Sequence, residues 1–247
     1  LCGMDRYEEG EIYINDEETS YFGVEDLENF RRQYVAFIFQ HYNLIESYTV
    51  LQNVEAPLIL SGLSKEDVRI RALEIIDRVG LSSHKNHKAT RLSGGQKQRV
   101  VIARALAKDC PIIAADEPTG NLDSKSGKEV MELLREIAKE KLVILVTHQY
   151  EEVKEYATRK LRLFDGEIVE DISLRPTDKK NLPSINAAEN KVSFKEQIKI
   201  ALRNLIAAPK KTFLMVVVFA FFSLFIALAY AGFLSMTITQ SHWNHHF

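Results

Sequence analysis

Apolar runs alternate with amphipathic stretches along the first 170 residues of the chain. Four short runs rich in β-branched residues predict strands, and the last two are apolar enough for buried parallel strands: 11–15, 35–39, 112–115 and 142–147. No strand period occurs between Val50 and Ala107, where Ser64 begins a predicted helix and Gly80 ends it. The pattern predicts an α/β core with a helical insert.

A predicted hairpin ends this part of the chain. Its strands are Lys160 to Phe164 and Glu167 to Glu170, joined by the turn Asp165-Gly166. The following residues, 171–193, contain two prolines and no clean period, which is typical of a linker. We therefore expect one globular domain over residues 1–170.

The last part of the chain has a different pattern. Apolar residues recur at helical spacing over 194–211 with lysines between them, which predicts an amphipathic helix on a membrane surface rather than one packed on its own domain. An uncharged run of 22 residues follows, from Phe213 to Leu234, and as a helix it would span roughly 33 Å. We predict a transmembrane helix over 212–238, because a buried core helix is rarely apolar all round.

Charge gives the predicted span a direction. The segment before it is rich in lysine, and no Asp, Glu, Lys or Arg occurs after Lys211. The positive-inside rule then places the N-terminal part in the cytoplasm and residues 239–247 at the start of an extracellular region. The expected location is a cell membrane with the globular domain on the cytoplasmic side.

Composition excludes several classes of protein. The chain has 247 residues, of which 46% are hydrophobic and 27% charged, with a net charge of −2, so it is neither disordered nor basic enough to suggest a nucleic-acid partner. Its two cysteines, Cys2 and Cys110, cannot form a disulfide framework and are expected to be buried thiols.

Two adjacent carboxylates follow the predicted strand 112–115. Asp116 and Glu117 lie at its carboxyl end, where open α/β sheets bind ligands. Adjacent acids repel each other unless a cation or a proton separates them. We expect one of these carboxylates to bind Mg²⁺ and the other to orient a water molecule.

A glycine pair precedes a helical run about 20 residues earlier. The segment Leu92 to Gln96 reads LSGGQ. Its glycines allow backbone N–H groups to approach a phosphate, and the helix that follows favours an anion at its N-terminus. The alternative is a flexible turn with a helix cap, which this five-residue string makes improbable.

Taken together, LSGGQ, IIAADEPTGNLD and LVTH in this order resemble the nucleotide-binding domain of ABC transporters, which has a P-loop NTPase fold. The resemblance covers roughly residues 1–170. The sequence EPTGNLD, followed by the basic helix predicted over 194–211 (the elbow) and one predicted span, is similar to ABC transporters of the macrolide-exporter and lipoprotein-release type. The resemblance implies ATP and Mg²⁺ as cofactors.

It also implies roles for individual residues. Glu117 matches the catalytic glutamate that polarises the attacking water, and His148 matches the switch histidine that contacts the γ-phosphate. Gln40 matches the Q-loop glutamine, which contacts Mg²⁺ and water, and Asp116 matches the aspartate that acts on Mg²⁺. These roles suit phosphoryl transfer, which depends on positioned charge.

A second group of matches implies a partner domain. The signature of the family closes on a nucleotide bound to the opposite subunit, and the matching residues are Ser93, Gly94, Gly95 and Gln96. Asp123 matches the D-loop aspartate at the dimer seam. The expected partner is a second nucleotide-binding domain, in a homodimer or a heterodimer.

The sequence departs from the family at one motif. It contains no G-x-x-x-x-G-K-[S/T] segment, and the run from Gly120 to Lys128 has the wrong spacing. The fold is therefore expected to lack the first strand and the phosphate loop. Because the chain begins with Leu1, we expect a fragment cut at both ends, with a naturally degenerate, non-hydrolysing partner domain as the alternative.

The first functional hypothesis is the ATPase portion of an exporter for an antimicrobial peptide, a macrolide-like drug or a lipoprotein. Its partners would include membrane lipid and the remaining permease segments. The second hypothesis is a membrane-anchored mechanotransmission ATPase that regulates cell-envelope enzymes. A DNA-repair ATPase with the same signature is disfavoured by the absence of long heptads and by the predicted span.

Overall fold

A computed structural model describes residues 13–14, 17–19, 22–175, 198, 215 and 217–232. The chain divides into two units, Leu1–Glu196 and Gln197–Phe247. The helices of the first unit are α1 (Val24–Tyr34), α2 (Val50–Leu60), α3 (Lys65–Arg78), α4 (Gly94–Ala107), α5 (Ser124–Ile137) and α6 (Tyr150–Val153), with short 3₁₀ turns η1 (Ser82–His84) and η2 (Ala89–Arg91). Its strands are β1 (Tyr13–Ile14), β2 (Glu17–Glu18), β3 (Val35–Ile38), β4 (Ile112–Asp116), β5 (Leu142–Val146), β6 (Arg159–Phe164) and β7 (Glu167–Ser173).

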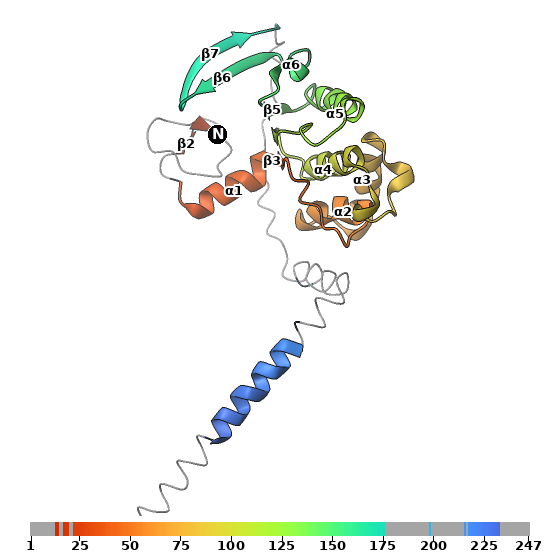
Figure 1. Cartoon of the computed structure of the whole chain (residues 1–247), viewed down its shortest axis with the longest axis vertical. Helices are drawn as coiled ribbons and strands as arrows, with labels where there is room; N and C mark the ends of the chain where they lie inside the picture. Colours follow the sequence, from red (N-terminus) through yellow and green to blue (C-terminus); the bar gives the residue numbers. More distant parts are fainter. Residues whose placement is uncertain are drawn as a thin grey trace, which may run out of the picture. The chain divides into compact units, whose positions relative to one another are not determined.

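Three parallel strands form the central sheet in the order β3-β4-β5 (Figure 1). Ile113 of β4 lies opposite Ala36 of β3 and Val143 of β5. The predictions of strands beginning at residues 35, 112 and 142 are confirmed. Because the strands are parallel, their carboxyl ends share one edge of the sheet, and each of those ends leads into a segment singled out in the sequence.

Burial of β5 is a point on which the sequence prediction was wrong. β4 is covered on one face, with Ile113 and Ala115 buried, as expected for the central strand. The two ends of β5 are exposed instead, with Leu142 at 47% and Val146 at 60%. Within the part of the chain that the structure describes, β5 has a neighbouring strand on one side only, whereas β4 lies between two strands.

Helices α2, α3 and α4 form the predicted helical insert (Figure 1). The predicted start of α3 is confirmed, because the Ser64 hydroxyl oxygen accepts a hydrogen bond from the Asp67 N–H. Gly80 follows the helix with a φ of +69°, a conformation that favours glycine. Apolar side chains from all three helices are fully buried: Val54, Leu58, Ala72, Ile76, Val100 and Ile102.

The terminal hairpin of this unit, β6–β7, is confirmed with one change. Both turn residues, Asp165 and Gly166, have positive φ, as a tight two-residue hairpin turn requires. β7 continues to Ser173, beyond the predicted end at Glu170, because it stays paired with β6 as far as Arg159. Ion pairs across the strands accompany this extension, Arg159 with Asp171 and Lys160 with Glu170. Of the predicted strand 11–15, only residues 13 and 14 are described, and they form β1.

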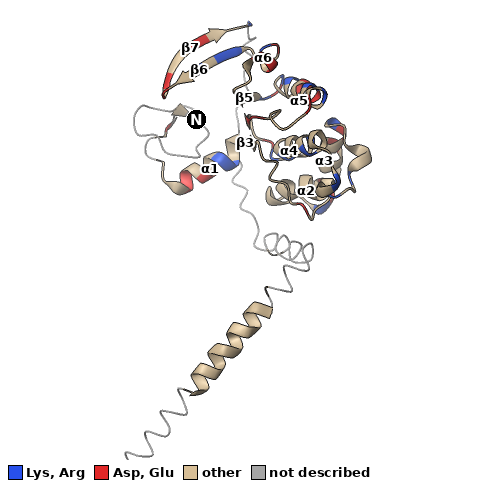
Figure 2. Cartoon of the chain, viewed as in Figure 1, with Lys and Arg blue, Asp and Glu red and all other residues tan. Residues whose placement is uncertain are grey.

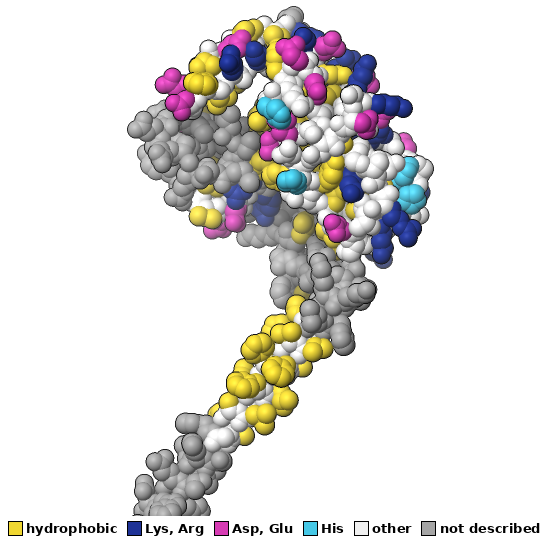
Figure 3. All heavy atoms as spheres, in the orientation of Figure 1, with side chains coloured by type: hydrophobic (Ala, Val, Ile, Leu, Met, Phe, Trp, Pro, Cys, Tyr) yellow, Lys and Arg dark blue, Asp and Glu magenta, His cyan; other side chains and the backbone are white. Residues whose placement is uncertain are grey.

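In the second unit the described residues 217–232 are helical. They carry no charged side chain (Figure 2), and hydrophobic side chains cover the visible surface of the helix (Figure 3). Among the described residues, no helix combines the length and the apolar character needed to cross a membrane. The remainder of the predicted span 212–238, nearly all of the predicted elbow 194–211, the linker after residue 175 and residues 239–247 lie outside the described residues. These assignments stay predictions.

Candidate active site

Glu117 follows β4 directly and has an unusual backbone conformation. Its φ is +44°, a region that non-glycine residues seldom occupy. Its N–H donates to the carbonyl of Val146 at 2.9 Å, which continues the β4–β5 pairing one residue beyond the strand. The chain then turns, and the Gly120 N–H donates to the Glu117 carbonyl at 3.2 Å. This turn holds the Glu117 side chain beside the carboxyl end of β5.

The Glu117 carboxylate accepts three hydrogen bonds from the two residues after β5. The backbone N–H and the ring Nδ1 of His148 lie 2.8 and 2.6 Å from Oε1, and the Thr147 hydroxyl lies 3.0 Å from Oε2. Because a carboxylate only accepts, Nδ1 carries the proton. Burial alone would raise the pKa of Glu117, but these hydrogen bonds outweigh it, so the pKa lies below its usual range. The site thus holds an ionised carboxylate in a fixed orientation.

Asp116, the last residue of β4, has different surroundings. Its side chain is exposed and makes no hydrogen bond or ion pair with any described residue. Both carboxylate oxygens are therefore available to a cation, and carboxylate oxygen is a preferred ligand of Mg²⁺. Nowhere in the described ranges do three or more His, Cys, Asp or Glu side chains cluster as a metal site. The donor set fits an ion that takes one or two protein ligands and completes its shell from phosphate and water.

Gln40 lies two residues after the end of β3, close to the turn that follows β4. Its backbone carbonyl accepts a hydrogen bond from the Asn121 amide at 3.2 Å. A methyl group at Gly120 would lie 3.7 Å from the Gln40 amide nitrogen and 3.6 Å from Cβ of Glu117. Both are ordinary van der Waals distances, and they place the Gln40 side chain beside the Glu117 segment.

The LSGGQ segment forms the first turn of α4. Ser93 is the N-cap residue, and its hydroxyl oxygen accepts from the Gln96 N–H at 3.3 Å. The Gln96 side-chain oxygen accepts in return from the Ser93 N–H at 3.0 Å, which completes a capping box. The hydroxyl proton of Ser93 is not used by this arrangement, so a donor is left at the helix N-terminus.

Both glycines of this segment are closely packed. A methyl group at Gly95 would lie 2.9 Å from Cβ of Ser126, in the first turn of α5. At Gly94 it would lie 3.1 Å from the Tyr42 hydroxyl and 3.3 Å from the Leu122 side chain. The loops after β3 and β4 and the start of α4 therefore meet at one point.

Asp123 has a local role at the start of α5. Its carboxylate accepts from the Ser126 N–H at 3.0 Å and caps the helix. This hydrogen bond lowers the pKa of Asp123 below its usual range. Because Ser126 also packs on Gly95, the hydrogen bond that caps α5 holds Ser126 against the first turn of α4.

Known proteins share this set of segments. A sequence model described as ABC transporter matches residues 1–120. An uncharacterized ABC transporter ATP-binding protein of Methanocaldococcus jannaschii, MJ1508, is 46% identical over 174 residues, which are 70% of this chain and 77% of that protein. This chain belongs to the ABC transporter ATP-binding family.

Three further comparisons support the family assignment. A solved structure titled as the dimeric structure of the ABC transporter cassette MJ0796 is 43% identical, with a TM-score of 0.63 over 71% of this chain and 78% of that chain. Another structure of MJ0796, titled as dimeric and bound to ADP and Pi, has a TM-score of 0.62 at 42% identity. The macrolide export ATP-binding/permease protein MacB of Bartonella quintana is 42% identical over 169 residues, and this chain covers 26% of that protein.

The structure of this ABC cassette brings the predicted site residues together in two groups. The first group surrounds Glu117 and includes His148 in direct contact, with the Gln40 amide near the same turn. The second group is the capped turn of α4, Ser93 to Gln96, against the start of α5 after Asp123. Asp116 precedes Glu117 in the chain, but its side chain makes no hydrogen bond or ion pair with either group.

Four side chains that the sequence analysis passed over also belong to this ABC site. Thr147 donates to Glu117, and Asn121 donates to the Gln40 carbonyl. Tyr42 packs on Gly94, and burial raises the pKa of its hydroxyl. His84 contacts Gln96. Thr147 and Asn121 are neighbours in sequence of residues in the motifs, and this position was the signal that could have indicated a place in the site. The local sequence pattern does not distinguish Tyr42 or His84 in this way.

Proposed function

We propose that this cassette hydrolyses ATP, with Glu117 as the group that polarises the attacking water. The observation that carries the proposal is the fixed, ionised Glu117 carboxylate, held by three donors from the end of β5. A carboxylate with a lowered pKa is charged at neutral pH and can accept a hydrogen bond from water. Its orientation is set before any substrate arrives, which is the arrangement that phosphoryl transfer favours.

Three other residues near Glu117 take complementary roles: His148, Gln40 and Asp116. His148 donates through Nδ1 to Glu117, and its Nε2 would donate to a terminal phosphate when the ring carries a second proton. Asp116 and the Gln40 amide are the residues that would hold Mg²⁺, the cofactor proposed with ATP. When bound, Mg²⁺ supplies positive charge that neutralises the phosphate oxygens.

The capped turn of α4 is proposed to complete the site of a second cassette. The Ser93 hydroxyl proton and the start of α4 offer donors to an anion. The relatives' structures are dimeric, and one is titled as bound to ADP and Pi, which supports a partner across this surface. Asp123 would lie near the seam because it caps the adjacent helix.

We further propose that the cassette powers export at a bacterial membrane from the cytoplasmic side. Relatives named as macrolide export ATP-binding/permease proteins support this proposal, as does the uncharged segment that includes residues 217–232. This chain spans about a quarter of those relatives, so its permease partner, its orientation and its substrate are proposals too. A peptide, a macrolide-like drug or a lipoprotein is the proposed class of substrate.

The proposal is tested by changing Glu117→Gln in the protein as its gene encodes it. Glutamine keeps the size of the side chain and removes the charge, so hydrolysis should fall by about 10²- to 10⁴-fold while ATP binding is kept. Phosphate release and nucleotide binding are measured side by side. The matched control is Glu132→Gln on α5, an exposed glutamate, which should leave both unchanged. Hydrolysis at the normal rate by the Glu117 variant would end the proposed role.

A further inference from the structure

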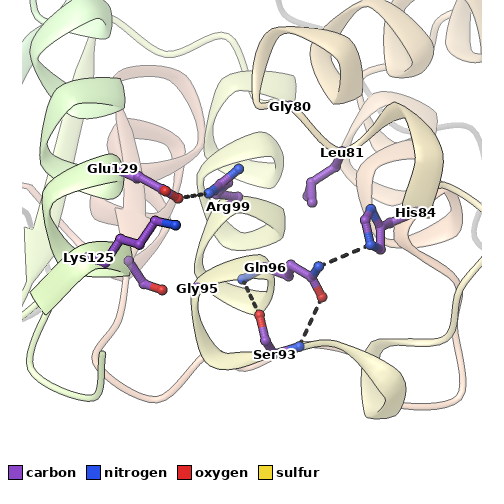
Figure 4. A pocket seen from close by; sticks show the side chains of 10 residues that line it. Gly80, Leu81, His84, Ser93, Gly95, Gln96, Arg99, Lys125 and Glu129 are labelled. Atoms are coloured by element: carbon purple, nitrogen blue, oxygen red, sulfur yellow. Dashed lines mark hydrogen bonds and ion pairs between the residues drawn. The ribbon is translucent and has the colours of Figure 1, made fainter. Parts of the chain in front are cut away.

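A polar pocket lies beside the capped turn of α4 (Figure 4). Its walls come from η1, from the first turns of α4 and from the start of α5. Arg99 and Glu129 form an ion pair on one side of it, and Lys125 lies near them (Figure 4). His84 of η1 lines the opposite side and points toward Gln96.

The Gln96 amide has a defined orientation in this pocket. Its oxygen accepts from the Ser93 N–H, and an N–H group cannot accept, so the atom facing Ser93 must be the oxygen. The amide nitrogen is then the atom 3.0 Å from the Nε2 of His84. Because an amide nitrogen only donates, Nε2 of His84 must be the acceptor.

The protonation of His84 follows from this contact. A ring nitrogen that accepts carries no proton, so His84 is neutral and its proton lies on Nδ1. Nδ1 lies 2.9 Å from the Ser83 hydroxyl, which can accept that proton. The hydrogen bonds therefore run in one direction. The Ser93 N–H donates to Gln96, the Gln96 amide donates to His84, and His84 donates to the Ser83 hydroxyl.

We propose that His84 is a positioning residue for the signature turn. Acting through Gln96, it keeps the amide oxygen on the Ser93 N–H and so holds the capped turn that carries the Ser93 hydroxyl in the conformation proposed to meet a nucleotide. Without an acceptor at this place, the amide can rotate and the capping box loses its return hydrogen bond. The inference rests on the proposed role of this turn in binding a nucleotide held by a second cassette.

Two variants separate the acceptor from the ring. His84→Phe keeps a planar ring beside His87, whose ring centre is 5.1 Å away, but it removes the acceptor. His84→Gln loses the ring and can place a carbonyl oxygen near the position of Nε2. Both are made together with Glu117→Gln, so that ATP is not consumed and dimers accumulate.

The measurement is the protein concentration at which half of the cassettes dimerise in the presence of MgATP. His84→Phe should raise it about three- to tenfold, and His84→Gln should change it less than about twofold, because one hydrogen bond is lost in the first variant and kept in the second. Equal values for all three proteins would overturn the inference, as would equal weakening by both variants. If the Glu117→Gln parent forms no dimer with ATP, the proposed function fails instead.

A spectroscopic test reads the protonation of His84 in the protein without any substitution. In protein labelled with ¹⁵N histidine, the Nε2 of His84 should have the chemical shift of an unprotonated nitrogen and Nδ1 that of a protonated one at neutral pH. The resonance is assigned by its loss in His84→Gln. A proton on Nε2 would overturn the inference whatever the variants do.

Discussion

The contact between Gly95 and Ser126 gives the sharpest stability prediction. A β-carbon added at Gly95 would lie 2.9 Å from Cβ and 3.0 Å from Oγ of Ser126, and 3.9 Å from its Cα. The close atoms belong to the first turn of a helix, so they cannot rotate away as the end of a long side chain can. Gly95→Ala must therefore push α4 and α5 apart at this point.

The magnitude follows from two opposing effects. Overpacking of this kind costs about 1–3 kcal/mol. Alanine favours the helix over glycine by up to about 1 kcal/mol, and by less in a first turn. The free energy of unfolding should fall by about 1–2 kcal/mol in Gly95→Ala.

A double-mutant cycle tests the cause. Ser126→Gly removes the obstructing β-carbon, so in that background Gly95→Ala should become neutral or stabilising. Ser126→Ala keeps the β-carbon and should not relieve the loss. The free energies are measured by urea unfolding followed by far-ultraviolet circular dichroism. Additive effects in the Ser126→Gly cycle, or relief by Ser126→Ala, would refute the packing argument.

Two more predictions concern ionisable groups. The folded pKa of Glu117 lies below the ordinary value of 4.5, so the contribution of this carboxylate to stability is present above that pH and is lost as the pH falls through the folded pKa. Between about pH 5 and 3, the free energy of unfolding of Glu117→Gln, measured by urea titration, should therefore change less than that of the unsubstituted protein. Lys108→Met removes an ammonium group whose Nζ donates to the carbonyls of Arg31 and Val35 at 2.6 and 2.7 Å, so it should lower the free energy of unfolding by about 1–3 kcal/mol. Lys108→Arg, which keeps the charge, is the comparison, and an unchanged midpoint for the methionine variant would contradict the second prediction.

Local signals predicted the framework of the site. Serine at an N-cap and glycine after a helix mark the two ends of α3, because both act within one turn of the backbone. Apolar runs predicted β3, β4 and β5, and parallel pairing then explains why Gln40 and Glu117 follow strands at the same edge.

Contacts between distant segments could not be predicted in this way. The His84 ring reaches Gln96 only because η1 folds back beside α4, and no period in the sequence encodes that approach. The exposure of Val146 depends on which strands flank β5, and the apolar sequence of β5 does not indicate its neighbouring strands. The orientation of Glu117 toward Thr147 likewise depends on the positive φ of Glu117, and a glutamate in the sequence does not indicate a positive φ.

The positive φ of Glu117 has a consequence for how such cassettes change over generations. A left-handed backbone costs a non-glycine residue about 1–2 kcal/mol, and glycine would occupy it freely. The three hydrogen bonds that the Glu117 carboxylate accepts offset this cost, so the strain at this backbone position is borne by contacts of the same side chain. A cassette released from the need for hydrolysis would recover this strain only by a change to glycine, and that change would also lose the hydrogen bonds that join the carboxyl ends of β4 and β5.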